Sequence, residues 1–422
     1  MLRTARLLPA LMAAVMVAGC GSMTASQSAT RGGSVEANAA KGHGHETDLS
    51  DGNLKAQLVD SGLLQEAVGK LRDRYTFKTL IISPMTGRGA QPKGDGPTVT
   101  GVLRYPDFAG KLIPAANVTI HVEAKGMVGA KDVATAVTDA DGRWTAVLPA
   151  NLAGKAVSVN YELGNERWTI NKYRWAGPAI EAVGPVNDTG VRALDPTSEN
   201  GQAALIHQVW NRALATFQRE GIPLDWWKSR IGTNWPANGD YYSMGTVNLT
   251  DAKQWDVNGH EIGHSMFFAA FNSAGGGGQH KIDECYGSDL AWSEGFASFF
   301  SGVISVERND PDAKFEYMVP RRKPIRLENV PTDVCEGYTN EWRVSAALWD
   351  IYDTHDDGTD RIAVEFKTIW GALVKTSGGA RMTDVRDAFK RIAAVTPASE
   401  RQGLADAFAQ AGVPIALRVA GK

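Results

Sequence analysis

The sequence His-Glu-Ile-Gly-His at 260–264 constrains this chain more than any other feature. Two histidines four residues apart share one face of a helix, where both imidazoles can bind one zinc ion with a carboxylate beside them. Apolar residues recur through this segment at three- and four-residue spacing, and no proline interrupts residues 251–271. The pattern therefore predicts a helix that carries a metal site, with His260 and His264 as ligands.

A hydrolytic zinc site needs a third protein ligand and an open position for water. Glu294 is the candidate, because it lies in a second apolar, proline-free stretch that we expect to form a buried helix from about Ser288. Burying a carboxylate among large aromatic residues is costly unless the carboxylate is paired, hydrogen-bonded or metal-bound. The alternative is that Glu294 is an ordinary salt-bridge partner or faces solvent.

With these residues in place, the segment 260–300 resembles the gluzincin metallopeptidases, the thermolysin-like superfamily. In that superfamily a glutamate on the next helix completes the site. The Glu-Gly-Phe-Ala run at 294–297 is also similar to a segment of certain bacterial secreted metallopeptidases. The resemblance implies that Glu261 is the general base. One position departs from the pattern: Ser298 stands where an aspartate would orient a zinc-binding histidine, so we expect a backbone carbonyl or another acid to do this instead.

The resemblance extends to the Leu-Trp-Asp at 348–350. Relatives carry a histidine eleven residues before this tryptophan, and it stabilises the transition state. The corresponding residue here is Tyr338, whose hydroxyl could donate to the oxyanion. The competing interpretations are that Glu341 or Arg343 faces the site, or that Tyr338 is only a packed loop residue. His280 is a further possible ligand or donor, although a solvated loop position is the favoured interpretation.

The N-terminus has the pattern of a bacterial export signal. Arginines precede an apolar run at 7–18, which is too short to span a membrane, and Val-Ala-Gly-Cys at 17–20 resembles a lipobox. We expect residues 1–20 to be a lipoprotein signal peptide, with Cys20 lipidated. An ordinary cleaved signal peptide is the alternative. Gly21 carries no strong instruction for inner-membrane retention, so the outer membrane is the preferred site of the anchor.

The other two cysteines, Cys285 and Cys335, are expected to form a disulfide, because an exported protein meets an oxidising compartment. Such a bond would close a loop of about fifty residues and stabilise the fold by about 4 kcal/mol in the chain-entropy model. It would tie the segment before Glu294 to the segment before Tyr338. A cysteine as zinc ligand is less favoured, since neither residue lies in a Cys-x-x-Cys pattern.

Short period-two stretches between Thr98 and Pro149, joined by Gly, Pro and Asp turns, predict strands. The segment 138–143, which includes Asp-Gly, predicts a tight hairpin. Residues 97–177 therefore resemble a small transthyretin-like or carboxypeptidase-regulatory β-sandwich, and a generic immunoglobulin-like sandwich is the alternative. His121 is expected to be a packed or exposed strand residue rather than a ligand.

The predicted fold class is α+β and multidomain: the β-sandwich precedes a mainly helical zincin-type metallopeptidase domain with a small strand-rich lobe. Residues 21–51 are predicted to be a flexible tether, 52–96 a helix-strand segment and linker, and 195–422 the peptidase domain. The resemblance to gluzincins implies that Met244–Leu249, just upstream of the helix at 260–264, is the edge strand that pairs with substrate. About three helices are expected after Asp360, with Thr383 and Ser399 as caps.

Five aspartates cluster from the end of the Leu-Trp-Asp segment onward, at positions 350, 353, 356, 357 and 360. Oxygen ligands at this density could bind Ca²⁺, although the spacing does not fit an EF-hand loop. Pairing with Lys or Arg, or simple solvation, is the alternative. Zn²⁺ at the helical site and Ca²⁺ here are the cofactors that the sequence suggests.

Two classes of function follow from these patterns. The favoured one is a zinc metallopeptidase, expected to be an endopeptidase, that is tethered by lipid to an exported membrane face and cleaves peptide or protein substrates with Glu261 as general base. The other is a catalytically weak or silent peptidase-fold lipoprotein that binds a protein or glycan. The net charge of −3 shows no basic excess, so no nucleic-acid partner is expected, and the sequence does not indicate an oligomeric state.

Overall fold

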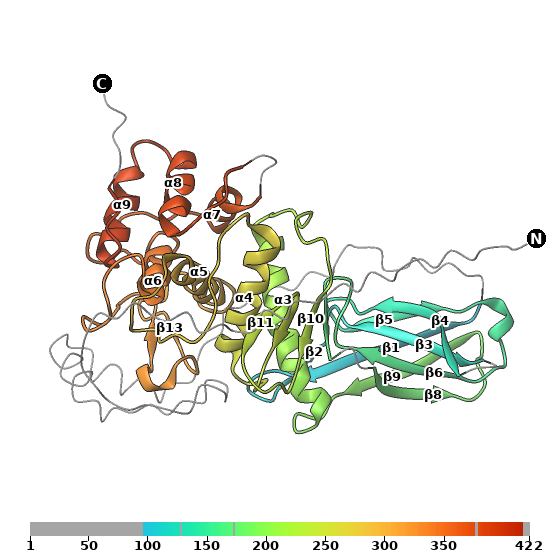
Figure 1. Cartoon of the computed structure of the whole chain (residues 1–422). Helices are drawn as coiled ribbons and strands as arrows, with labels where there is room; N and C mark the ends of the chain where they lie inside the picture. The colour runs from blue at the N-terminus through green and yellow to red at the C-terminus, as the bar shows by residue number, and fades with distance from the viewer. Residues whose placement is uncertain (1–95, 127–128, 172–173, 376–378, 417–422) are drawn as a thin grey trace, which may run out of the picture. The chain divides into compact units, whose positions relative to one another are not determined.

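The computed structural model describes residues 96–126, 129–171, 174–375 and 379–416 (Figure 1). The predictions for the signal peptide, Cys20, the tether and the segment 52–96 lie outside these residues. The described part is a mixed α/β fold with several sheets and seven α-helices. Among its helices, none combines the length and the apolar character that crossing a membrane requires.

Two four-stranded sheets make up the first part of the described chain (Figure 1). In the first sheet, β1 pairs antiparallel with β2 and β5 and parallel with β9. The second is antiparallel, in the order β4-β3-β6-β8. The strands are β1 (Thr98–Pro106), β2 (Leu112–Pro114), β3 (Thr119–Lys125), β4 (Ala130–Val137), β5 (Arg143–Val147), β6 (Val157–Glu162), β8 (Trp175–Ile180) and β9 (Val186–Ala193).

Alternate residues of β1 and β5 are buried, as the period-two pattern predicts. Val99, Leu103 and Tyr105 of β1 enter the same apolar core as Ile120 and Val122 of β3. The turn 138–143 does not make a hairpin, so that prediction is wrong: β4 and β5 belong to different sheets, and the turn carries the chain from one sheet to the other.

A third sheet has the order β11-β12-β10-β7. Its strands are β7 (Trp168–Ile170), β10 (Ile231–Asn234), β11 (Tyr241–Ser243) and β12 (Thr246–Asn248). Because β12 pairs with β10 on one side and β11 on the other, the expected edge strand at Met244–Leu249 is wrong. The two edge strands of this sheet are β11 (Tyr241–Ser243) and β7.

The helices are α3 (Glu199–Arg219), α4 (Trp255–Ala270), α5 (Ser288–Ser305), α6 (Glu341–Asp350), α7 (Phe366–Leu373), α8 (Val385–Val395) and α9 (Arg401–Gln410). Short strands β13 (Lys314–Phe315) and β14 (Ile325–Arg326) pair between α5 and α6 in the sequence. Three helices follow Asp360, as predicted. The predicted caps are wrong, because Asp384 caps α8 and Glu400 precedes α9 without a side-chain cap.

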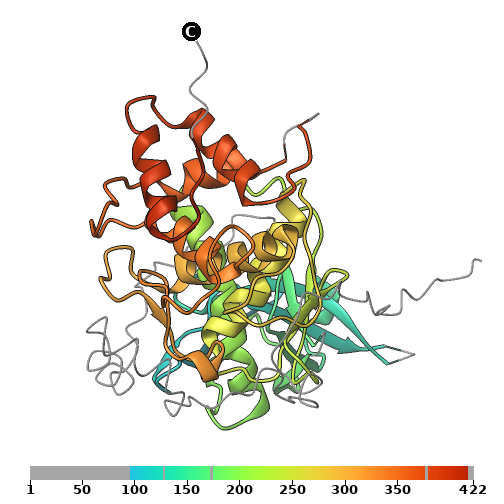
Figure 2. The same cartoon turned by 60° about the vertical axis from the view of Figure 1, so that its left-hand side comes forward.

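Helix α5 packs against both α4 and α6 (Figures 1 and 2). Glycines allow the close approach. A Cβ atom at Gly263 of α4 would lie 2.8 Å from the Ala297 carbonyl oxygen of α5, and one at Gly295 of α5 would lie 2.5 Å from the Val344 Cγ1 atom of α6. These contacts fix the spacing of the three helices that carry the candidate site.

Candidate metal centre

Three side chains from α4 and α5 converge on one point. The Oε2 atom of Glu294 lies 3.0 Å from Nε2 of His260 and 3.0 Å from Nε2 of His264, and the two Nε2 atoms are 3.1 Å apart. In a tetrahedral zinc site with bonds of about 2.0–2.1 Å, ligand atoms are separated by about 3.3 Å. Two imidazole nitrogens and one carboxylate oxygen at this spacing fit the donor set of a catalytic zinc site.

The pKa values of the two imidazoles show that the Glu294 carboxylate favours a positive charge beside it. Burial lowers the pKa of His260 to about 4, so this imidazole is neutral near pH 7, as a ligand must be. Burial opposes protonation of His264 as well, but the Glu294 carboxylate outweighs it and raises the pKa to about 9. A proton therefore balances the charge of Glu294 when no metal does, and metal binding would release it.

The hydroxyl of Ser298 orients His260. Its Oγ atom lies 3.0 Å from the Nδ1 atom of His260 and 3.7 Å from the sulfur of Met318. Since Nε2 is the atom directed at Glu294, the imidazole proton belongs on Nδ1. The Nδ1–H group then donates a hydrogen bond to the Ser298 hydroxyl oxygen, and the hydroxyl donates to the sulfur of Met318. The expectation that a backbone carbonyl or another acid would replace the missing aspartate is wrong, because the serine itself fills that position.

The segment that carries Met318 is held by α4. The Asp256 carboxylate, in the first turn of that helix, accepts hydrogen bonds from the backbone N–H groups of residues 316–318 at 2.6, 2.6 and 3.1 Å. A charge-assisted set of this kind is stronger than neutral hydrogen bonds. It therefore fixes the support behind Ser298 and His260.

Glu261 lies on the same helix and is buried. Burial raises its pKa to about 8, and the carboxylates of Glu294 and Asp240 act in the same direction, whereas His264 opposes them. A divalent cation at the site would oppose the rise further, because positive charge favours the ionised form. A carboxylate with these neighbours is suited to exchange a proton near neutral pH.

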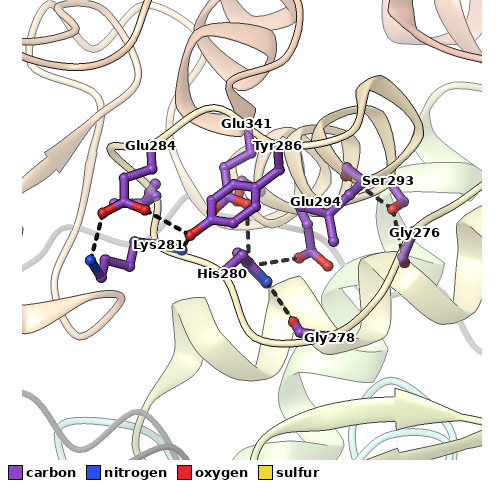
Figure 3. A network of polar contacts seen from close by, with 12 residues as sticks. Gly276, Gly278, His280, Lys281, Glu284, Tyr286, Ser293, Glu294 and Glu341 are labelled. Carbon is purple, nitrogen blue, oxygen red and sulfur yellow. Dashed lines mark hydrogen bonds and ion pairs between the residues drawn. The ribbon is translucent and has the colours of Figure 1, made fainter. Parts of the chain in front are cut away.

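His280 brings a third imidazole to the site (Figure 3). Its Nε2 atom lies 3.2 Å from Oε2 of Glu341 and 3.7 Å from Oε2 of Glu294, and its Nδ1 atom donates to the Gly278 carbonyl at 2.9 Å. The side chain is only 16% exposed, so the favoured interpretation of a solvated loop histidine is wrong. Burial opposes protonation of His280, but the carboxylates of Glu341 and Glu294 outweigh it and raise its pKa.

The predicted disulfide between Cys285 and Cys335 is present, with Cα atoms 5.6 Å apart. It joins the loop before α5 to the loop before α6. The Asn340 side chain, which caps α6, also donates to the carbonyls of Ile282 and Glu284 at 2.8 and 2.9 Å. These links hold the His280 loop beside the start of α6, where Glu341 lies.

Tyr338 lies in the loop before α6 and faces α8. The Arg386 guanidinium carbon sits 4.0 Å from the centre of its ring, a cation–π contact, and the Asp384 carboxylate holds the guanidinium. Its role as an oxyanion donor stays a prediction. Arg343 donates to the carbonyls of Cys335 and Val334, so its guanidinium fixes the loop backbone.

Comparison with known proteins gives one informative match. Residues 206–404 match the family model described as Mycolysin C-terminal domain. This supports a relationship to the thermolysin-like metallopeptidases and indicates a peptidase. No curated protein matches the chain.

One solved structure that matches is a 9R-lipoxygenase from Cyanothece PCC8801, at 15% identity and a TM-score of 0.17. The match covers 40% of this chain and 30% of that one, so it spans less than a third of the lipoxygenase. At this TM-score the likeness supports no conclusion about fold or activity.

Proposed function

We propose that this protein is a zinc-dependent endopeptidase of the gluzincin type. The observation that carries the proposal is the convergence of His260, His264 and Glu294 within 3.1 Å of one another, next to the buried carboxylate of Glu261. The match to the Mycolysin C-terminal domain supports it independently. A protein that keeps a peptidase fold but has lost catalytic activity usually lacks one of these four side chains, and all four are present here.

A bound zinc ion would lower the pKa of a water molecule toward about 7 and polarise the scissile carbonyl. Glu261 accepts the proton of the attacking water and delivers it to the leaving amine. Ser298 keeps the His260 ring in the orientation that directs Nε2 at the metal position. The aromatic core around α5 excludes bulk water behind the site, which strengthens the electrostatic interactions within it.

Two side chains compete for the role of oxyanion donor. Tyr338 is the candidate from the family pattern. His280 is the candidate from geometry, because its Nε2 atom lies 3.7 Å from the ligand oxygen of Glu294 while the Tyr338 ring contacts Arg386. The substitutions Tyr338→Phe and His280→Gln distinguish them: loss of the true donor lowers kcat about 100-fold or more with little change in KM.

Substrate backbone is expected to pair with β11. This short strand is an edge strand of its sheet and packs against α4, and the Tyr242 ring stacks on Phe268 of that helix at 5.7 Å. Main-chain pairing at an edge strand gives affinity for extended peptides of many sequences. The proposal is therefore a peptidase for peptide or protein substrates with broad backbone recognition.

We propose that this activity lies outside the cytoplasm. We propose that Cys20 is lipidated and that the anchor lies in the outer membrane. We also propose that the two N-terminal sheets form an accessory sandwich of the transthyretin or carboxypeptidase-regulatory type. A disulfide in the site region is consistent with an oxidising compartment.

The test uses a peptide whose two ends are chemically blocked and which carries a fluorophore and a quencher. An endopeptidase cleaves it, a chelator abolishes cleavage, and one equivalent of zinc restores it. Cleavage that survives complete removal of zinc would overturn the metal-dependent mechanism. Cleavage of only unblocked peptides would overturn endopeptidase action.

A further inference from the structure

A second group of acidic side chains lies away from the zinc-type site, where the chain leaves α6. Glu328 comes from the segment after β14, Asp350 is the last residue of α6, and Asp353 and Asp360 belong to the connection toward α7. All four are buried, with exposed fractions of 7%, 1%, 1% and 2%. Carboxylates are rarely buried at this density unless something balances their charge.

Some buried polar atoms of this cluster have no hydrogen-bond partner. Neither carboxylate oxygen of Asp350 accepts a hydrogen bond, and the Nδ1 atom of His355 is also without one. Ligand atoms of Glu328, Asp353 and His355 lie within 4.8 Å of one another. A buried polar atom without a partner is costly, so the two oxygens of Asp350, surrounded by three other buried carboxylates, point to a site for a cation.

Basic side chains do not supply the missing charge. In the described part of the chain, no ion pair joins Lys or Arg to any of the four carboxylates. Arg361, the neighbour of Asp360, donates to backbone carbonyls, and Arg308 pairs with Glu365. Burial and the nearby carboxylates raise the pKa of Asp353 to about 10, the direction expected for crowded acids with no cation among them.

Two other contacts pre-orient the cluster. The Trp349 indole N–H donates to Oε1 of Glu328 at 2.8 Å, and the backbone N–H of Ile362 donates to Oδ1 of Asp360 at 3.2 Å. Each bond uses one oxygen and leaves the other available. Fixed carboxylates with a free oxygen each are what a coordination site requires.

We propose that Glu328, Asp350, Asp353 and Asp360 bind one calcium ion. Calcium accepts six to eight oxygen ligands in flexible geometry, and the irregular chain from 351 to 365 can add carbonyl and water oxygens. Magnesium demands nearly ideal octahedral geometry, and zinc would favour His355 with fewer carboxylates. The ion would fix the connection between α6 and α7, and α6 packs against the helix that carries Glu294.

The test uses the full-length, zinc-loaded protein in buffer freed of calcium, with zinc content measured before and after. Calorimetric titration with CaCl₂ is expected to show one site, and Tm is expected to rise by about 5 °C at a calcium concentration of 100 times Kd. Titrations with MgCl₂ and ZnCl₂ run in parallel. No binding of calcium, or binding of zinc alone by this second site, would overturn the proposal.

Two aspartate variants make the test specific. Asp353→Asn removes a buried ligand charge, so calcium binding and the Tm rise are lost, while Tm without calcium stays at or above that of the parent. Asp356→Asn changes an exposed neighbour in the same loop and keeps the full response. If Asp353→Asn does not fold, Glu328→Gln replaces it. Undiminished calcium binding by a folded variant of either buried acid would refute the site.

Discussion

The substitution Gly263→Ala tests how the close packing of α4 and α5 supports the metal centre. A methyl group at this position would lie 2.8 Å from the Ala297 carbonyl oxygen and 2.9 Å from the Ala297 Cα atom. Both are backbone atoms of a helix and cannot rotate away, so the two helices must separate by about 0.5 Å to reach ordinary van der Waals contact. Overpacking of this kind costs about 1–3 kcal/mol.

A matched control removes the intrinsic effect of alanine. Gly371 lies on the exposed side of α7, and a Cβ atom there would meet nothing within 4 Å. Alanine at this position should raise the free energy of unfolding by about 1 kcal/mol, the usual gain over glycine inside a helix. Because both substitutions contribute that gain, the difference between them isolates the overpacking, and we expect Gly263→Ala to be less stable than Gly371→Ala by about 1–3 kcal/mol.

Urea unfolding gives the stability difference, and competition with a chromophoric chelator gives the zinc affinity. Separation of the helices moves His260 and His264 away from Glu294, so the affinity of Gly263→Ala for zinc should fall about tenfold or more. The Gly371→Ala protein should bind zinc like the parent. Equal stabilities and equal zinc affinities for the two variants would refute this account of the helix spacing.

Three further predictions concern single contacts. Ser298→Ala should weaken zinc binding about 10-fold to 100-fold, because His260 loses the acceptor that orients it; unchanged affinity in a chelator competition would show that the hydroxyl is not needed. Replacing Cys285 and Cys335 with serine should lower the free energy of unfolding by about 4 kcal/mol, since the bond closes a loop of 50 residues; urea midpoints that match the parent would contradict this. Burial lowers the pKa of His207 to about 4, and its ring accepts from an indole N–H and donates to a backbone carbonyl, so it is neutral in the folded state. As the pH falls from about 6.5 to about 4, the His207 imidazole therefore becomes protonated in the unfolded chain but stays neutral in the folded protein. This difference lowers the free energy of unfolding by up to about 3 kcal/mol across that pH range. A His207→Gln variant should show a flatter dependence of unfolding free energy on pH.

Local patterns predicted much of the helical framework. The helix around 260–264 and the second helix from Ser288 are present, because each rests on apolar periodicity within its own segment. The disulfide is also present, as the expected export signal and the number of cysteines predict. The two helices depend on residues that are close together in the sequence. The disulfide depends on cysteine, of which the chain has three.

Features that depend on distant segments were missed. The sequence favours a solvated position for His280, because nothing in its own loop indicates that Asn340 and the disulfide hold that loop beside Glu341. The edge strand was misplaced because parallel pairing of β12 with β10 leaves no mark in the sequence of either strand. Ser298 was read as a gap in the pattern, although a hydroxyl at that position of the helix reaches the same imidazole nitrogen.

Zinc content and proteolysis, measured together on the full-length protein and on Glu261→Gln, test the central claim most directly. The account predicts one zinc per molecule in both proteins and cleavage of an unfolded protein substrate by the parent alone, because the substitution removes the base and leaves the three ligands in place. Zinc in both proteins without cleavage by either would favour a binding role for the fold. Absence of zinc from the parent, or equal cleavage by the two proteins, would contradict the assignment of the metal centre.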